Sequence, residues 1–193
     1  MIPELPTRPR AVLDACVLYP TVMREVLLAV ARQGLFAPVW SARLLEEWAR
    51  AAARRGTLEE AQARGEVAAT RAAFPEAETC GEQAGRAEGL AARLWLPDAA
   101  DIHVLATAVA TSADGIVTVN ARDFPRAALA EEGLARWDPD AFLMALWLRA
   151  PDAVAAAADG VRAEAARLDA APADLRALLR KARLPRLAKA LAT

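Results

Sequence analysis

Short apolar segments with the character of buried strands alternate with longer helical segments, and this alternation is what most limits how the chain can fold. The clearest strand is Gly115–Val119, which is short, rich in β-branched residues and apolar on one side. Three further strands are expected at 11–14, 36–39 and 134–137. Strands separated by helices form βαβ units, so the sequence predicts an α/β fold with a mostly parallel central sheet flanked by helices.

Local signals place the helices between these strands. A helix is expected over Thr21–Arg32, with Gly34 as its left-handed stop. Ser41 is a suitable N-cap for the next helix. Thr57–Glu60 fits a capping box that begins another helix, which should end before Phe74 because a proline follows it.

The later part of this region is less regular. Residues 76–96 predict a short strand near Glu78–Cys80 with a turn of helix after it. Pro97–Asp98 then precedes a clear helix from Ala99 to about Ser112, and another helix is expected near Arg126–Glu132.

From Asp138 onward the sequence predicts helices only, over 140–149, 152–168 and 172–183, with a short turn after Pro185. We therefore divide the chain into an α/β domain (1–137) and a C-terminal helical appendage (138–193). Leucines recur at helical spacing in the last turns and need a surface to pack against: Leu175, Leu178, Leu179, Leu184, Leu187 and Leu191.

Composition bounds the function. The 193 residues carry a formal net charge of −1, so attraction to nucleic acid has to come from local basic groups. Candidates are Arg50, Arg54, Arg55, Arg176, Arg180, Lys181, Arg183, Arg186 and Lys189, although a solvated helix face is the commoner explanation for such groups, particularly in the tail. Two cysteines without a CxxC spacing, no signal-peptide pattern and no long apolar run predict a cytoplasmic protein without a membrane span.

Two aspartates are the first candidates for a chemical role. Asp14 stands at the carboxyl end of the first strand, where α/β sheets bind ligands, or it simply turns the chain into the next loop. Asp101 falls on the helix face shared with Leu105, Ala108 and Val109, where a buried carboxylate needs a partner. The alternative for Asp101 is an outward first-turn acid, a role that suits the N-cap residue Asp98 better.

Two neighbouring glutamates compete for a place on the helix that follows Ser41. Glu47 lies nearer than Glu46 to the apolar face of that helix, so we expect Glu47 to face the site. His103, the only histidine of the chain, projects opposite the apolar stripe of its helix and is expected to be exposed or to contact a site residue from behind.

Two more polar residues follow the clearest strand. Asn120 shares a strand side with Thr118, and Asp123 either joins the site or orders the turn before Phe124–Pro125. Strand-end and buried-face acids of this kind suit hydrolysis of a phosphodiester by Mg²⁺ or Mn²⁺, which neutralises the phosphate and activates water. Hard cations of this kind prefer carboxylate oxygens.

At this point four segments resemble successive motifs of the PIN-domain family, in the expected order and at similar spacing: Val12–Pro20, Trp40–Trp48, Leu96–Ala108 and Ile116–Pro125. The resemblance spans about residues 10–140 and is strongest to the VapC-type branch, the RNA-cleaving toxins of bacterial toxin–antitoxin pairs. It implies a PIN-like three-layer fold with five parallel strands, a homodimer, an RNA substrate and a cognate antitoxin protein as partner. The helical tail is similar to the extension of one PIN subgroup.

Transferred residue by residue, the resemblance makes Asp14, Glu47 and Asp101 the first three acids of a catalytic metal site. The fourth position departs from the pattern because Asn120 stands two residues after Thr118 where an aspartate is common. Either Asn120 or Asp123 then completes the site.

Other classes fit less well. A haloacid-dehalogenase-like phosphatase needs an acid at position 16, which is a cysteine here, and neither a dinucleotide-binding glycine-rich turn nor a P-loop is present. The remaining alternative is a catalytically degenerate PIN fold that binds RNA or protein, against which the acids at positions 14, 47 and 101 argue.

Overall fold

A computed structural model describes residues 2–169 and 174–191 of the protein. Its centre is a parallel sheet in the order β2-β1-β3-β4. The strands are β1 (Arg10–Leu13), β2 (Ala37–Val39), β3 (Gly115–Val117) and β4 (Ala135–Trp137). The expectation of an α/β fold with a parallel sheet is confirmed, and all four strands lie where the sequence places them.

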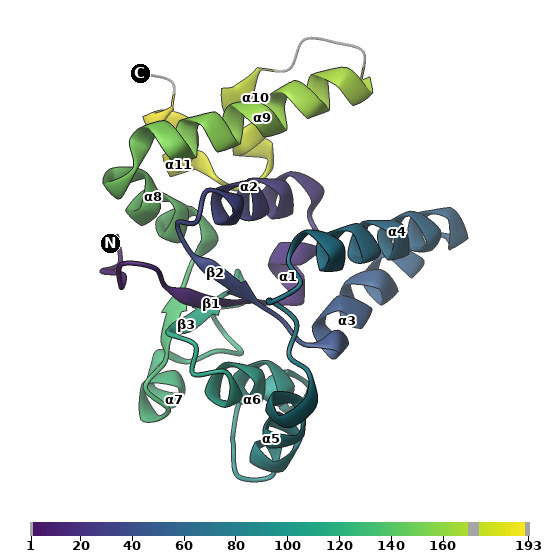
Figure 1. Ribbon diagram of the computed structural model, residues 1–193, viewed down its shortest axis with the longest axis vertical. Coiled ribbons are helices and arrows are strands. Elements are labelled where there is room, and N and C mark those ends of the chain that lie inside the picture. The colour runs from purple at the N-terminus through teal and green to yellow at the C-terminus, as the bar shows by residue number, and fades with distance from the viewer. Residues whose placement is uncertain (1, 170–173, 192–193) are drawn as a thin grey trace.

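Helices cover both faces of this sheet, as Figure 1 shows. On one side lie α2 and the C-terminal helices; on the other lie α5, α6 and α7, while α3 and α4 extend from the end of the sheet. The helical elements are α1 (Ala15–Leu18), α2 (Thr21–Arg32), α3 (Ala42–Ala53), α4 (Thr57–Ala73), α5 (Gly81–Ala91), η1 (Ala99–Asp101), α6 (Ile102–Ala110), α7 (Arg126–Glu131), α8 (Pro139–Arg149), α9 (Pro151–Asp169), α10 (Leu175–Lys181) and α11 (Pro185–Ala190). The three-layer arrangement therefore matches the prediction. No helix in the described part of the chain has the length and apolarity to span a membrane.

The register of the strands brings their carboxyl ends to one edge. Val12 is paired with Val39 on one side and with Ile116 on the other, and Ile116 is paired with Arg136. All three pairings are parallel, so the residues that follow β1 and β3 leave the sheet side by side. This edge is where ligands bind in open α/β sheets.

The contact between β3 and β4 depends on a glycine. A Cβ atom at Gly115 would lie 2.5 Å from the carbonyl oxygen of Ala135 and 3.0 Å from the ring of Trp137. These atoms belong to the neighbouring strand and a buried ring, so neither can move aside easily. A side chain at Gly115 would therefore force β4 away from the centre of the sheet.

Most helix boundaries confirm the sequence signals. The α2 helix covers the expected Thr21–Arg32, and Gly34 has a left-handed φ of 77° after it. The hydroxyl of Ser41 accepts a hydrogen bond from the N–H of Leu44 at 3.3 Å, as an N-cap should. The capping box at Thr57 is wrong, because Gly56 holds the cap position and Thr57 is already the first helical residue.

The segment between α4 and α6 corrects two expectations. The strand near Glu78–Cys80 is reduced to one isolated parallel bridge between Trp40 and Glu78, so the described residues form four strands and not the five implied by the resemblance. Gly81 has a left-handed φ of 52° and turns the chain away after this bridge. The expected turn of helix is instead the eleven-residue α5.

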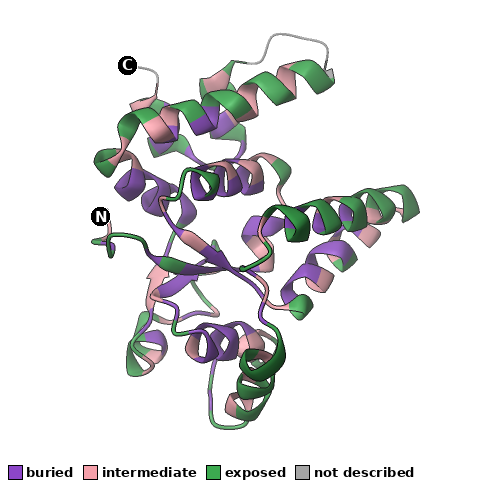
Figure 2. Ribbon diagram, in the orientation of Figure 1, coloured by how far each residue is buried: buried purple, intermediate pink, exposed green. Residues whose placement is uncertain are grey.

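The C-terminal helices share the core of the α/β domain. Phe142 of α8 packs edge-on against Phe36 and stacks on Trp137, with ring centroids 5.1 Å apart in both pairs. Of the leucines expected to form an apolar stripe, Leu179, Leu184 and Leu187 are fully buried within the same hydrophobic cluster. Figure 2 shows the buried faces of α2, α8 and α9 turned toward one another. The predicted helix 172–183 begins outside the described residues, which resume at 174.

A buried carboxylate connects two of these helices. Both carboxylate oxygens of Asp140 in α8 accept backbone hydrogen bonds at the start of α11, from Arg186 at 2.9 Å and from Leu187 at 3.0 Å. Burial raises the pKa of Asp140 above its ordinary value, and these two N–H groups oppose that rise. Asp140 therefore satisfies backbone donors that would otherwise be buried without a partner.

We expect Asp140→Ala to lower the free energy of unfolding by about 1–2 kcal/mol, the usual cost of losing a helix cap. The matched control is Asp152→Ala, because Asp152 is an exposed first-turn acid of α9 and should contribute only a few tenths of a kcal/mol. Urea unfolding of both variants measures the difference. Equal losses in the two variants would contradict the capping role.

Candidate metal centre

Asp14 follows β1 directly and is held at the carboxyl edge of the sheet. Its side chain is buried, with 7% of the residue exposed. Its Oδ2 atom accepts a hydrogen bond from the hydroxyl of Thr118 at 2.7 Å and one from the thiol of Cys16 at 2.8 Å. Asp14 is also the N-cap residue of α1, and its backbone carbonyl accepts the first bonds of that helix, but its carboxylate makes no capping bond and is left to other partners. Both donors approach one oxygen, which leaves Oδ1 for another ligand.

Cys16 is a hydrogen-bond donor in this arrangement. Burial, then the negative charge of Asp14, raises the pKa of its thiol to about 12, so the thiol stays protonated at neutral pH. Its sulfur accepts a bond from the N–H of Val119 at 3.4 Å. From the sequence alone, Cys16 served to exclude a phosphatase and, with Cys80, to indicate a reducing environment, but no role beside Asp14 was expected of it. The position of Cys16 two residues after the strand-end acid Asp14 was the signal that could have identified it as a hydrogen-bond donor to that carboxylate.

Three aspartates gather beside Asp14. Asp98, Asp101 and Asp123 each place one carboxylate oxygen within 4.8 Å of the others, the only group of this kind among residues 2–169 and 174–191. Asp98 also caps η1 by accepting a bond from the N–H of Ala100 at 2.8 Å. The N-cap role expected for Asp98 is thus confirmed, and the same residue joins the acidic group. From the sequence alone, only the N-cap role of Asp98 was expected.

Crowding of negative charge changes the acidity of Asp101. Burial is the largest cause, and the charges of Asp14, Asp98 and Asp123 add to it, so that the pKa of Asp101 rises to about 6. Asp101 is half-buried at the end of η1, where it is the N-cap residue of α6, and its carboxylate approaches those of Asp98 and Asp123. A carboxyl group that is this costly to ionise would be relieved by a cation.

The loop after β3 carries Asp123 into the group. The N–H of Asn120 donates to the Thr118 hydroxyl at 2.9 Å, and its side-chain amide donates to Oδ2 of Asp123. One guanidinium nitrogen of Arg136 holds the same loop by donating to the carbonyls of Ala121 at 2.7 Å and Phe124 at 2.8 Å. The structure therefore places Asp123 among the acids and Asn120 behind it as a support.

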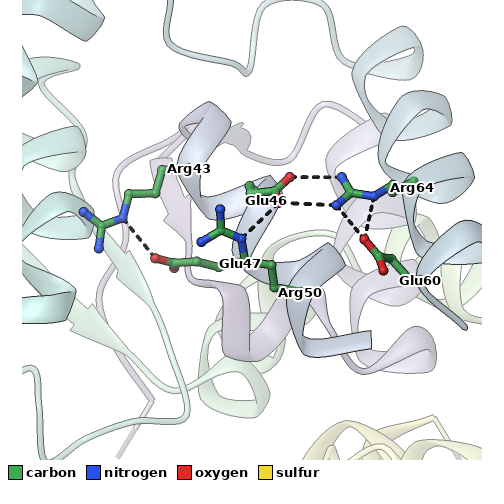
Figure 3. Close-up of polar contacts among 6 residues, drawn as sticks. All are labelled: Arg43, Glu46, Glu47, Arg50, Glu60 and Arg64. Atoms are coloured by element: carbon green, nitrogen blue, oxygen red, sulfur yellow. Dashed lines mark hydrogen bonds and ion pairs between the residues drawn. The ribbon is translucent and has the colours of Figure 1, made fainter. Parts of the chain in front are cut away.

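The two competing glutamates of α3 point in different directions (Figure 3). Oε1 of Glu47 lies 3.1 Å from Nε of Arg43 and 2.9 Å from Nε2 of His103, on the side of α6. Glu46 instead pairs with Arg50 and with Arg64 of α4, at 3.0 Å in both cases. Glu47 nevertheless lies outside the group formed by the three aspartates.

Two neighbouring side chains compensate for the partial burial of Glu47. Burial opposes its ionisation, but His103 and Arg43 outweigh that effect and hold the pKa of Glu47 below its ordinary value. Arg43 also donates to the carbonyl oxygen of Ala100 at 3.1 Å, which links α3 to the segment that carries Asp101. Glu47 thus flanks the acidic group from the neighbouring helix.

Of the two alternatives expected for His103, exposure is the one that the structure excludes. Its side chain is 13% exposed and contacts Glu47, which matches the alternative of a supporting contact. The contact is at ion-pair distance but its angle is not that of a hydrogen bond, and Nδ1 has no partner among the described residues. The helix α5 packs on α6, and its Ala87 and Ala91 line a pocket together with His103, which explains a burial that the periodicity of α6 alone did not show.

The donor set of this centre fits a hard divalent cation. Carboxylate oxygens come from three elements and converge where the pKa of Asp101 is already raised. Such oxygens suit Mg²⁺ or Mn²⁺. The one nearby sulfur, on Cys16, is protonated and used as a donor, so the set offers no soft ligand.

We expect Asp101→Asn to stabilise the protein when chelator is present. The folded state raises the pKa of Asp101 from 3.8 to about 6, so the folded protein binds the proton more tightly than the unfolded chain. Ionisation then costs stability as the pH rises through this interval, and the cost is complete above it. The variant should melt higher by roughly 2–4 °C near pH 7.5, with the difference vanishing near pH 4.

Thermal melts in EDTA across this pH range measure the effect. Glu131→Gln removes an exposed acid outside the centre and serves as the control. A stabilisation of Asp101→Asn that stays constant down to pH 4 would show that charge repulsion is not its cause.

A comparison with known protein families matches the part of the chain that contains most of these residues. A protein-family model described as a PIN domain matches residues 10–122. No curated protein and no solved structure gives a match. The matched range extends from β1 to the loop after β3, so it contains Asp14, Glu47, Asp101 and Asn120 and ends one residue before Asp123.

Proposed function

The chain belongs to the PIN-domain family, and on that basis we propose that it is a metal-dependent endoribonuclease that hydrolyses phosphodiester bonds in RNA. The observation that carries the proposal is the convergence of Asp98, Asp101 and Asp123 beside Asp14 at the carboxyl edge of the sheet. PIN domains are in general metal-dependent nucleases, and this chain retains an acidic centre where such chemistry would occur.

In this proposal the residues of the centre are either cation ligands or hydrogen-bond donors that position those ligands. Asp14, Asp98, Asp101 and Asp123 would hold Mg²⁺ or Mn²⁺, which when bound would neutralise the scissile phosphate and supply an activated water. Thr118 and Cys16 fix the Asp14 carboxylate by donating to its Oδ2 atom. Asn120 fixes Asp123 in the same way. Preset donors of this kind leave the carboxylates little freedom to turn away from the cation.

Glu47 enters the proposal as the acid that flanks this group. Its carboxylate is held by Arg43 and His103 on the side of α6. Because this pairing keeps Glu47 ionised, we assign it to the outer part of the cation site, next to the three aspartates. Glu46 has no such role, since it is paired with Arg64 of α4.

We further propose that the protein is the toxin of a toxin–antitoxin pair of the VapC type. The four motifs quoted above support this assignment, as does the helical extension after β4. The partners in that case are a cognate antitoxin protein and a second copy of the chain in a homodimer. The setting is the cytoplasm.

Metal dependence is the first test of the nuclease. The purified protein should cleave single-stranded RNA with Mg²⁺ or Mn²⁺ and stop when EDTA is added. Asp14→Asn and Asp101→Asn should each lower the rate by about a hundredfold or more, because each removes a charged ligand. Gel analysis of a labelled RNA measures cleavage. Equal cleavage with and without chelator would rule out the mechanism, and binding without cleavage would favour the degenerate PIN alternative.

The neighbouring glutamates provide a matched test of the outer site. Glu47→Gln should reduce the cleavage rate by about tenfold or more, the scale expected for loss of a group that supports a metal site. Glu46→Gln removes the same charge from the same helix turn, at a similar side-chain exposure of 37% against 33%, and should leave the rate nearly unchanged. If Glu46→Gln proves the more damaging change, the assignment of Glu47 is wrong.

A further inference from the structure

Arginines line a cavity on the side of the molecule formed by α7, β4, α8 and the start of α11. The cavity measures about 680 Å³, and its walls include Arg126, Arg136, Arg183 and Arg186. Two of these arginines come from the α/β domain and two from the C-terminal extension. In Figure 1 the elements concerned lie at the left, with the N-terminal segment beside them.

Three of these guanidinium groups have no partner within the described residues. Arg136 is engaged with the carbonyls of Ala121 and Phe124, whereas the side chains of Arg126, Arg183 and Arg186 make no hydrogen bond or ion pair there. All three are exposed. The proximity of Arg126 adds to the effect of burial in lowering the pKa of Arg136, so the positive charges are close enough to affect one another.

The acids in the same cavity are largely occupied by backbone donors. Asp138 accepts a bond from the N–H of Ala141 at 3.0 Å. Asp140 accepts from Arg186 and Leu187 with its two oxygens. Glu4, at the N-terminal side, is the remaining acid in the wall. The wall carries four guanidinium groups and three carboxyl groups, and the guanidinium groups of Arg126, Arg183 and Arg186 have free donors in the described part of the chain, so the cavity offers an anion both unpaired donors and an excess of positive charge.

The cavity is connected to the acidic centre through one loop. Arg136 fixes residues 121–124 by its two hydrogen bonds, and Asp123 lies within this segment. Arg126 begins α7 only three residues after Asp123. An RNA strand that places one phosphate at the acids carries further phosphates at every nucleotide, so one of them can follow this loop toward the cavity.

We propose that the arginine-lined cavity binds a phosphate of the RNA backbone away from the scissile one, so that the C-terminal extension contributes to RNA binding through Arg183 and Arg186. This inference rests on the proposed nuclease function. Guanidinium groups match phosphate because they offer paired donors in a plane. Backbone contacts of this kind position a strand without reading its sequence.

The test compares two pairs of tail arginines. Arg183→Gln with Arg186→Gln alters the cavity, and Arg176→Gln with Arg180→Gln removes the same charge from α10, which does not line the cavity. Binding of a labelled single-stranded RNA of about fifteen nucleotides is measured in EDTA, so that cleavage does not interfere, over a range of salt concentrations. Thermal melts confirm that both variants fold.

We expect the cavity pair to weaken binding by about threefold to fivefold per arginine at low salt. The slope of log affinity against log salt should fall by about 0.7 for each lost contact. The α10 pair should bind within about twofold of the unchanged protein. Glu4→Gln should strengthen binding, because it removes one of the negative charges in the cavity wall.

The outcomes separate this inference from the function on which it rests. Equal weakening by both pairs would mean attraction by net charge alone and would overturn the cavity site. Normal binding by the cavity pair, with metal-dependent cleavage intact, would overturn the cavity site and leave the nuclease standing. If the unchanged protein neither binds nor cleaves RNA, both proposals fail together.

Discussion

The parallel pairing of β1 with β3 is the constraint on which the candidate site depends. It joins residues that are about a hundred positions apart, since Leu13 pairs with Val117, and thereby sets Asp14 beside Thr118. The hydroxyl of Thr118 then donates to Asp14 while it accepts from the backbone of Asn120. Thr118 thus fixes the residue that follows β1 and the loop that follows β3 relative to each other. A shift of β3 by one residue would turn this hydroxyl to the other face and separate the loops.

The buried guanidinium group of Arg24 holds several helices together in a similar way. Arg24 of α2 is 1% exposed, lies 4.3 Å from the ring centre of Trp48 in α3, and donates to the carbonyl of Leu18 and to Glu66 of α4. Four helices therefore meet at one guanidinium group. Since Trp48 follows Glu47 directly, this packing also fixes the direction in which Glu47 leaves α3. A lysine could not replace Arg24, because only the planar guanidinium group can stack on the Trp48 ring and donate several hydrogen bonds at the same time.

The acidic centre opposes the stability of the fold that carries it. Asp101 is costly to ionise because Asp14, Asp98 and Asp123 surround it, and no basic side chain pairs with any of the four among the described residues. The positive groups nearby serve other purposes: Arg43 pairs with Glu47, and Arg136 holds loop carbonyls. Clustered carboxylates without a basic partner are typical of a site that is completed by a ligand. Here the missing partners are the arginine or lysine side chains that would ordinarily pair with the four aspartates.

The sequence by itself determined the order and kind of the main elements, because apolar periodicity and caps are local properties: α2 lies where its pattern places it, and Ser41 caps α3. It also identified Asp14, Asp101 and Asp123 as candidates from strand ends and helix faces.

Local sequence signals failed where contacts between distant segments determined the local structure. The segment near Glu78 pairs at a single position, with Trp40 just beyond the end of β2, and His103 is covered because α5 packs on α6. Only the tertiary structure showed that Asp98 joins the acids, that Cys16 and Thr118 share one carboxylate oxygen, and that arginines of the tail and of the α/β domain line one cavity. Each of these depends on distances between segments that are remote in sequence, and periodicity within one segment carries no information about such distances.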